Sequence, residues 1–254
     1  MTRRILIRIE YDGGPFVGWQ RQINGPSVQA TIEDAAQAFI HKPTIVAGAG
    51  RTDAGVHATG QAAHLEVPKK FNANRVMEAL NAHLTSVPIT ILNATEVPYD
   101  FHARFSATGR RYLYRILPRR QAPALNFGRV WHHKHHLDLK LMKIAAKHFL
   151  GQHDFTSFRA SKCQAESPVR TLNQLNVELI GDEIHIYAEA RSFLHHQIRN
   201  IAGTLTLVGR KKWHPDDVNL ALKAAHRSAA GPTAPAHGLY LIGVDYPSVY
   251  KSRD

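Results

Sequence analysis

Apolar residues at the start of the chain occupy every second position. Ile5, Ile7 and Ile9 alternate with positions that include two charged side chains. A period of two predicts a strand with one buried face, because successive side chains of a strand point to opposite faces. The turn-forming run Asp-Gly-Gly-Pro at 12–15 should end this first strand.

After Ser27, a residue type that often caps helices, apolar residues recur at helical spacing as far as Pro43. We therefore predict a helix that starts after Ser27 and ends before Pro43. The same reasoning predicts helices at about 72–84, from Asp138 to Gly151, at 194–208 and at about 216–226. It predicts strands at 44–47, 62–67, 89–97, 110–117, 172–179, 184–190 and 239–244, with a hairpin turn at Gly181-Asp182.

The order of these elements mixes helices and strands without regular strand–helix–strand alternation. We therefore predict an α+β fold in which helices pack on largely antiparallel sheets. At 254 residues, the chain is long enough for two domains of ordinary size.

The chain is strongly basic, with a formal net charge of +12 and a pI near 10.0. This surplus favours a polyanionic partner such as nucleic acid; the alternative is that the charge only keeps the protein in solution. A membrane is disfavoured, because no apolar stretch approaches the length of a span and the first residues do not resemble a signal peptide. The single cysteine, Cys163, excludes an intramolecular disulfide, so we expect a cytoplasmic protein.

Residues 48–64 read GAGRTDAGVHATGQAAH and contain one acidic residue, Asp53. The four glycines of this stretch permit turns and close backbone approaches that a side chain would block. A lone carboxylate in such a loop is a candidate nucleophile or general base. The alternative is an Asx-turn, in which the Asp53 side chain bonds its own backbone. The residues alone leave both interpretations open.

The loop resembles the signature of the TruA family of tRNA pseudouridine synthases, in which this Asp is the catalytic residue. The likeness continues along nearly the whole chain, through EYDG at 10–13, GWQRQ at 18–22, SVQ at 27–29, DFHARFSAT at 100–108, RYLY at 111–114, GQHDFTSF at 151–158, HHQIRN at 195–200 and GLYL at 238–241. The resemblance implies two related α/β lobes whose sheets join under a basic catalytic cleft. We expect an N-terminal lobe at 1–105 that carries the Asp loop and a C-terminal lobe at 106–254 that completes the cleft.

The resemblance also implies the function: an isomerase that converts uridine to pseudouridine at positions 38, 39 and 40 of the tRNA anticodon stem-loop, acting as a homodimer on its tRNA substrate. The reaction breaks the C1′–N1 bond, turns the bound uracil and joins C5 to C1′. Because nothing is oxidised and no group is imported, no cofactor is expected. The carboxylate serves as nucleophile or as base, and both routes need it in nearly the same place.

Three further residues match functional positions of the family. Tyr112 matches the tyrosine whose ring lies against the target base, and Arg199 matches the arginine that pairs with the catalytic Asp. Arg51 matches a position implicated in RNA contact and in replacing the flipped nucleotide, for which a planar guanidinium is suited. Without the family, Arg199 would be interpreted as a solvated helix-edge residue, Arg51 as a brace for the loop, and Tyr114 as a core residue.

Arginines interleaved with aromatic residues form the clearest basic patch. We expect Arg104, Arg110 and Arg111 to contact RNA phosphates, as part of a run that continues through Arg115, Arg119 and Arg120. The arginines on the predicted strand have an alternative role, which is to pair with acids inside the fold.

The run His-His-Lys-His-His at 132–136 looks like a metal tract, but it has no acidic or cysteine partner nearby. We therefore predict no metal site. Two other functions stay open on sequence: a tRNA-binding or chaperone protein without activity, and a metal-dependent phosphoesterase. The first would bind RNA without isomerising it, and the second would cleave RNA and stop in chelator.

Overall fold

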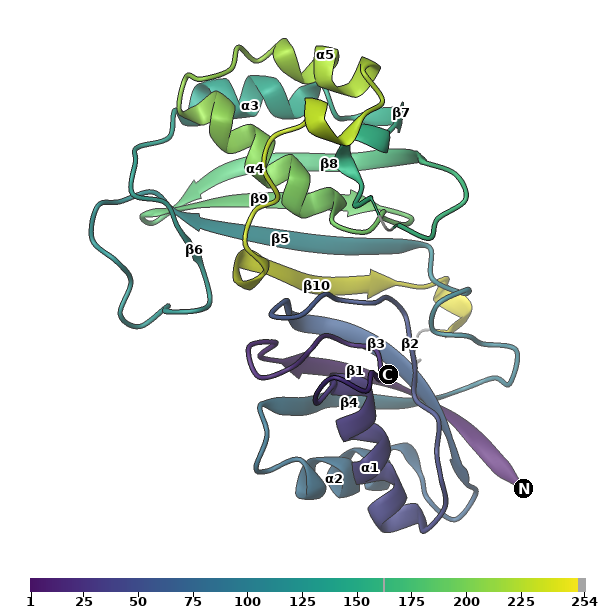
Figure 1. Ribbon diagram of the computed structural model, residues 1–254. Helices are drawn as coiled ribbons and strands as arrows, with labels where there is room; N and C mark the ends of the chain where they lie inside the picture. The colour runs from purple at the N-terminus through teal and green to yellow at the C-terminus, as the bar shows by residue number, and fades with distance from the viewer. Residues whose placement is uncertain (162, 251–254) are drawn as a thin grey trace. The chain divides into compact units, whose positions relative to one another are not determined.

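The computed structural model of the protein describes residues 1–161 and 163–250. The chain folds into two compact units, one formed by Met1–Arg110 together with the chain from Tyr240 on, and the other by Arg111–Leu239. Each unit combines helices with a largely antiparallel sheet, which confirms the predicted α+β class (Figure 1). The division differs from the one expected at 105 and 106 because the last strand belongs to the first unit.

The first unit contains six elements from the N-terminal part of the chain and nearly all of the last strand. They are β1 (Thr2–Tyr11), α1 (Val28–Ile40), β2 (Ala47–Gly48), β3 (His57–Pro68), α2 (Ala73–His83), β4 (Ile89–Val97) and β10 (Leu239–Asp245). The strands lie in the order β4-β1-β3-β10, with β2 paired to β3. Strand β1 runs antiparallel to both neighbours, whereas β10 runs parallel to β3 through Tyr240 and His57.

Both faces of this sheet are covered, which explains the burial along β1. Helices α1 and α2 pack on one face of this sheet (Figure 1), and Ile5, Ile7 and Ile9 are fully buried. Leu6, which points the other way, packs against a second apolar cluster around Phe101. Burial of these aliphatic side chains stabilises the unit by roughly 1.5–3 kcal/mol each.

The predicted caps of two helices are confirmed. The Ser27 hydroxyl accepts the Ala30 N–H at the start of α1, and the Asp138 carboxylate accepts the N–H groups of Lys140 and Leu141 at the start of α3. Each cap satisfies backbone donors that the first helical turn leaves without partners. The same contacts lower the pKa of Asp138, with the Leu141 N–H as the main cause.

The second unit holds the remaining strands and α-helices, except that Gly109 and Arg110 at the start of one strand belong to the first unit. They are β5 (Gly109–Leu117), β6 (Trp131–His132), α3 (Leu139–Lys147), β7 (Gly151–Asp154), β8 (Val169–Ile180), β9 (Glu183–Ala190), α4 (Gln197–Gly209) and α5 (Asp217–Lys223). The strands lie in the order β5-β9-β8-β7, with helices on one face of the sheet (Figure 1). The predicted hairpin is confirmed: β8 and β9 pair antiparallel, and Gly181 adopts φ 61° in the turn between them. That backbone conformation favours glycine.

Several boundaries differ from the predictions, and the short strands β6 and β7 were not predicted. Strand β3 begins at His57 rather than at 62, and β2 occupies 47–48 rather than 44–47. Helix α4 begins at Gln197 rather than at 194. Its start is delayed because His196 adopts the left-handed conformation at φ 65°, while the Gln197 side chain accepts the Leu194 N–H. Among the described residues, no helix is long and apolar enough to cross a membrane.

Candidate active site

The backbone beside Asp53 is clamped by a neighbouring segment. Gly18 forms an isolated antiparallel bridge with Asp53, and the Trp19 N–H donates to the Thr52 carbonyl at 3.0 Å. Gly18 adopts φ +116°, and a Cβ there would lie 2.6 Å from the Thr52 oxygen. Only glycine fits this approach without strain. The main chain that carries the half-buried Asp53 side chain is therefore fixed from outside the loop.

The loop is also fixed from within. The Val56 N–H donates to the Asp53 carbonyl at 3.1 Å, which closes a turn in which Gly55 adopts φ 76°. The Gln61 side chain, fully buried, donates to the Gly50 carbonyl at 2.9 Å. These bonds hold both sides of the loop in one conformation, so Asp53 is presented on a rigid support.

A buried pair of hydroxyls lies directly before Asp53. The Tyr11 hydroxyl, at the end of β1, lies 2.8 Å from the Thr52 hydroxyl, and both residues are buried. Sequence analysis assigned neither residue a role. The only available signal was that Tyr11 breaks the aliphatic alternation of β1 with a polar group that must find a partner when buried.

The turn after β1 also contacts the loop. Nδ1 of His57 lies 3.0 Å from the Gly13 N–H and 3.1 Å from the Asp12 carboxylate. A Cβ at Gly13 would lie 2.0 Å from the Val56 carbonyl oxygen. The Asp-Gly-Gly-Pro turn is therefore part of the support for the Asp53 loop as well as the end of a strand.

Arg110 supports the loop from a buried position. Its guanidinium donates to the carbonyls of Ala49 at 3.0 Å and Arg104 at 2.7 Å, and the residue is 9% exposed. The Arg110 guanidinium is thus hydrogen-bonded within the protein, and its contact with RNA stays a prediction. Arg51, Arg104 and Arg111 are exposed, as a phosphate contact requires.

Two other arginines of the basic run pair with acids, as the alternative interpretation stated. Arg115 binds both carboxylate oxygens of Glu183 at 2.8 Å, and Arg119 binds Asp182 at 2.7 Å. Burial of Glu183 opposes its ionisation, but hydrogen bonds from Arg115 and His185 hold the pKa of Glu183 below its usual value. These two arginines therefore help to fix the β8–β9 hairpin.

The tyrosines on β5 occupy different environments. Tyr112 is half buried, and its ring meets Phe193 edge-on at a centroid distance of 5.1 Å. Tyr114 is fully buried and donates its hydroxyl to the Pro235 carbonyl at 2.8 Å. Burial raises the pKa of Tyr114 well above its ordinary value, although Arg199 opposes the shift. This confirms a core role for Tyr114 and leaves Tyr112 as the partly accessible ring.

The Arg199 side chain is hydrogen-bonded within the protein, in contrast to a solvated helix-edge arginine. It lies on α4, whose apolar side buries Ile198 and Ile201, and its Nε donates to the Ala234 carbonyl at 2.8 Å. The Ala234 N–H in turn donates to the Arg199 carbonyl at 3.1 Å. This reciprocal pair fixes the base of the side chain.

The predicted site residues are divided between the two units. Arg51, Asp53, Arg104 and Arg110 belong to the first, and Arg111, Tyr112 and Arg199 belong to the second. The histidine run at 132–136 belongs to the second unit, where the imidazoles of His132 and His133 bond the backbone oxygens of Arg119 and His135.

The chain is similar to known proteins along nearly its whole length. Residues 7–106 and 145–247 match a family model described as tRNA pseudouridine synthase. A tRNA pseudouridine synthase A from Rhodospirillum centenum is 56% identical over 244 residues, which cover 96% of this chain and 100% of that protein. The proteins of the same name from Rhodospirillum rubrum and Caulobacter vibrioides (strain NA1000 / CB15N) are 54% and 53% identical, over 96% of this chain and over 88% and 98% of their own lengths.

Proposed function

The chain belongs to the tRNA pseudouridine synthase family, and we propose that it isomerises uridine to pseudouridine at positions 38, 39 and 40 of the tRNA anticodon stem-loop, with Asp53 as the catalytic carboxylate. Its relatives are isomerases that modify tRNA. The observation that carries the assignment to Asp53 is that its loop is held both by a neighbouring segment and by hydrogen bonds of its own. The backbone of this one acid, among glycines and basic residues, is held by its bridge to Gly18 and by the Val56 N–H, and the preceding Thr52 carbonyl is held by the Trp19 N–H.

The chemistry needs a carboxylate and little else from the protein. The C1′–N1 bond breaks, the uracil turns, C5 bonds to C1′, and the proton lost from C5 is balanced by one gained at N1. Asp53 either attacks C1′ and is later displaced, or removes a proton from the sugar. Because a rigid support keeps the carboxylate in place without reorganisation, it lowers the barrier on either route. The reaction requires neither a cofactor nor a metal.

The remaining site residues have complementary roles in this proposal. Tyr112 stacks against the extruded uracil, since its ring is partly accessible and is steadied by Phe193. Arg199 pairs with the Asp53 carboxylate and favours its ionised form. Arg51 fills the space of the flipped nucleotide, and Arg104 and Arg111 contact phosphates.

The net charge of +12 supports a polyanionic substrate. An enzyme that modifies three neighbouring positions is expected to recognise the shape of the tRNA rather than one sequence. We further propose that the protein acts in the cytoplasm as a homodimer whose two subunits grip one tRNA body. Sedimentation of the purified protein tests the dimer: a single species of twice the chain mass of 28.4 kDa is expected, and a monomer would contradict it.

The function is tested by incubating the purified protein with unmodified tRNA in the presence of a chelator and mapping pseudouridine at each position by chemical adduct labelling. We expect conversion at 38, 39 and 40, intact RNA and no effect of the chelator. Binding without conversion would favour the RNA-binding alternative. Chain cleavage that stops in chelator would favour the phosphoesterase.

A further inference from the structure

The segment 230–235 of the second unit lies along α4 (Figure 1). It follows a short 3-10 helix, Arg227–Ala229, and leads toward β10. The Gly231 N–H donates to the Thr204 hydroxyl at 2.9 Å. Further along the segment, the Ala234 backbone exchanges the two hydrogen bonds with Arg199 described above. The segment is therefore bonded to α4 near both of its ends.

The closest approach between this segment and α4 is at Gly203. A Cβ there would lie 1.7 Å from the Pro232 carbonyl oxygen, so the main chain of the segment rests directly on the helix. Gly203 and Thr204 stand one helical turn after Arg199 and Asn200, and residues three and four apart lie on the same side of a helix. The segment therefore covers the side of α4 that carries Arg199.

Arg227 bonds both the segment and α4. Its Nη1 donates to the carbonyls of Ala230 at 3.4 Å and Gly231 at 3.0 Å. Its Nη2 donates to the Thr233 hydroxyl at 3.0 Å and to the side-chain oxygen of Asn200 at 3.1 Å. A planar guanidinium presents several donors in fixed directions, so one side chain can hold four oxygens in a fixed arrangement. Arg227 therefore joins the segment to the helix.

Asn200 is the buried centre of this network. Its Oδ1 also accepts the Thr233 hydroxyl at 2.7 Å, and its Nδ2 donates to the Phe158 carbonyl at 2.8 Å. Its main-chain carbonyl accepts the Thr204 hydroxyl at 2.8 Å. Asn200 and Thr204 are both fully buried. A buried polar network whose groups are bonded in this way is rigid, because breaking any bond leaves a polar group without a partner.

The Arg199 side chain depends on the position of this segment. Its Nε donates to the Ala234 carbonyl, and Ala234 directly follows Thr233, which the network holds. On the other side, the Pro235 carbonyl accepts the hydroxyl of the buried Tyr114. The carbonyl that orients Arg199 is therefore fixed through both of its neighbours in the chain.

We infer that Arg227 is a positioning residue for the proposed reaction: it holds the 230–235 segment on α4 and thereby orients the Arg199 guanidinium, which the proposed function pairs with the Asp53 carboxylate. This inference rests on the proposed function. Arg227 acts through Arg199 and has no contact with the substrate in this role. Displacement of the Ala234 carbonyl turns the Arg199 side chain, and a misplacement of about 1 Å costs on the order of 100-fold in rate.

Arg227→Lys tests this role because it keeps the positive charge and removes the planar guanidinium. A single ammonium group cannot hold all four oxygens, so the segment should loosen. We expect kcat for pseudouridine formation to fall roughly 10-fold, while the KM for tRNA stays within about twofold of wild type, since the charge that attracts RNA is kept. An unchanged kcat would overturn the inference.

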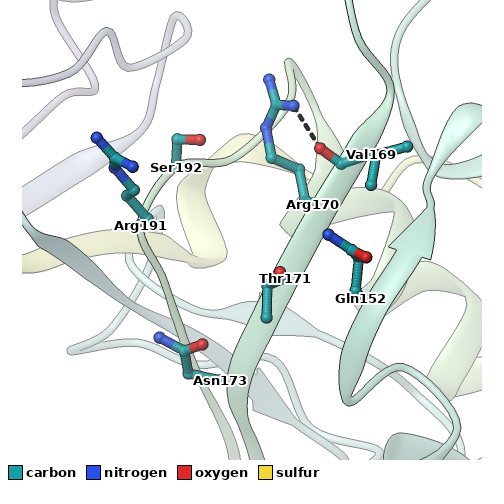
Figure 2. A pocket seen from close by; sticks show the side chains of 7 residues that line it. All are labelled: Gln152, Val169, Arg170, Thr171, Asn173, Arg191 and Ser192. Carbon is teal, nitrogen blue, oxygen red and sulfur yellow. Dashed lines mark hydrogen bonds between the residues drawn. The ribbon is translucent and has the colours of Figure 1, made fainter.

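Arg170→Lys is the matched control. Like Arg227, Arg170 is half buried in the second unit, and its Nη1 donates to two backbone carbonyls, those of Ser167 at 2.9 Å and Val169 at 2.7 Å. Figure 2 shows Arg170 on β8 with its bond to Val169, among the side chains that line a small hollow. These bonds stay within residues 167–170, so Arg170→Lys should keep kcat within about twofold of wild type.

A double-mutant cycle with Arg199 separates positioning from a general effect on the fold. If Arg227 acts through Arg199, then Arg227→Lys should lower the single-turnover rate roughly 10-fold in wild type but less than about twofold in Arg199→Gln. A loss by the same factor in both backgrounds would show that Arg227 only supports the fold, and it would overturn the inference.

Thr233 provides a second pair of variants, with thermal midpoints to check that every variant folds. Thr233→Val removes the hydroxyl that bonds both Arg227 and Asn200, and it should lower kcat with little change in KM. Thr233→Ser keeps the hydroxyl and should retain the wild-type kcat. Equal kcat values for Thr233→Val and Thr233→Ser would overturn the inference even if Arg227→Lys failed to fold.

Hydrogen exchange of the segment separates this inference from the proposed function. The N–H groups of Gly231 and Ala234 are bonded to α4, so they should exchange faster in Arg227→Lys but not in Arg170→Lys, whatever reaction the protein catalyses. An active wild type with unchanged exchange in Arg227→Lys would overturn the positioning role alone. An inactive wild type with faster exchange in Arg227→Lys would overturn the proposed function alone.

Discussion

At the scale of single residues, the proposed activity of Asp53 depends on neighbours that carry no charge. The Thr52 hydroxyl contacts Tyr11, the Thr52 carbonyl accepts from Trp19, and the next residue is the acid. A displacement of Thr52 is passed directly to Asp53, and misplacement by about 1 Å costs on the order of 100-fold in rate. Tyr11 is therefore a positioning residue.

Tyr11→Phe tests this role. Removing the hydroxyl leaves the buried Thr52 hydroxyl without the partner seen here, which costs about 1–3 kcal/mol. We expect kcat to fall roughly 10-fold or more with KM for tRNA nearly unchanged, measured by pseudouridine formation. Tyr99→Phe is the control, because its hydroxyl bonds Thr2 at the far end of β1. A rise in KM with unchanged kcat would show that Tyr11 acts on binding instead.

His64 provides a second prediction at this scale. Burial, with help from His102 and Arg4, lowers the pKa of His64 to about 4, and its Nδ1 accepts the Ala103 N–H at 3.2 Å. The unfolded chain, with a histidine pKa near 6.5, binds more protons than the folded chain between pH 6.5 and about 4. Stability is therefore lost as the pH falls through this window, by about 1–3 kcal/mol, with no further loss from this group below it.

The free energy of unfolding of His64→Asn, measured by denaturant titration across that window, should depend less on pH than that of wild type. His83→Asn, an exposed histidine at the end of α2, is the control and should keep the wild-type slope. The prediction fails if His64→Asn loses as much stability on acidification as wild type does.

At the scale of elements, the Asp53 loop is held by turns and strand ends rather than by helices. The turn after β1 contacts Val56, and the segment of Gly18 and Trp19 lies against Thr52 and Asp53. The residue after β2 is bonded to β3, because the Ala49 N–H donates to the Ala62 carbonyl at 2.7 Å. This bond joins the two ends of the loop. Two segments from outside the loop and the strand ends that flank it therefore fix its backbone.

Gly13→Ala tests the contact between the turn and the loop. Because the added Cβ would lie 2.0 Å from the Val56 carbonyl, the backbone has to move. We expect a loss of about 1–3 kcal/mol in the free energy of unfolding, as in other overpacked sites, and a lower kcat. Gly14→Ala is the control, because its new Cβ would meet only the Asp12 side chain, at 3.1 Å. Equal stability of the two variants would contradict the prediction.

Local signals predicted part of this arrangement. Ser27 and Asp138 cap helices because their side chains act on backbone groups two or three residues away, which a sequence displays directly. The hydrogen bond from Arg110 to the Ala49 carbonyl was not predicted, because the two residues are 61 positions apart in the sequence. The first residues of β3, HATGQ, were missed because all of them except Thr59 are buried, so that apolar and polar positions do not alternate.

At the scale of the whole molecule, the family resemblance was the strongest signal, and the relatives bear it out over 96% of the chain. The composition of the units was harder to predict. Strand β10 pairs in parallel with β3 although more than 170 residues separate their paired positions. No local pattern encodes that pairing, because it depends on the long connection that the second unit provides.

The role of Asp53 is tested most directly by single-turnover conversion of unmodified tRNA by Asp53→Asn, together with the Kd of this variant for the same tRNA. Asparagine keeps the shape of the side chain but can neither attack C1′ as a carboxylate nor remove a proton. We expect pseudouridine formation to fall at least ~1,000-fold while the Kd stays within about threefold of wild type. Conversion within tenfold of wild type would contradict the account.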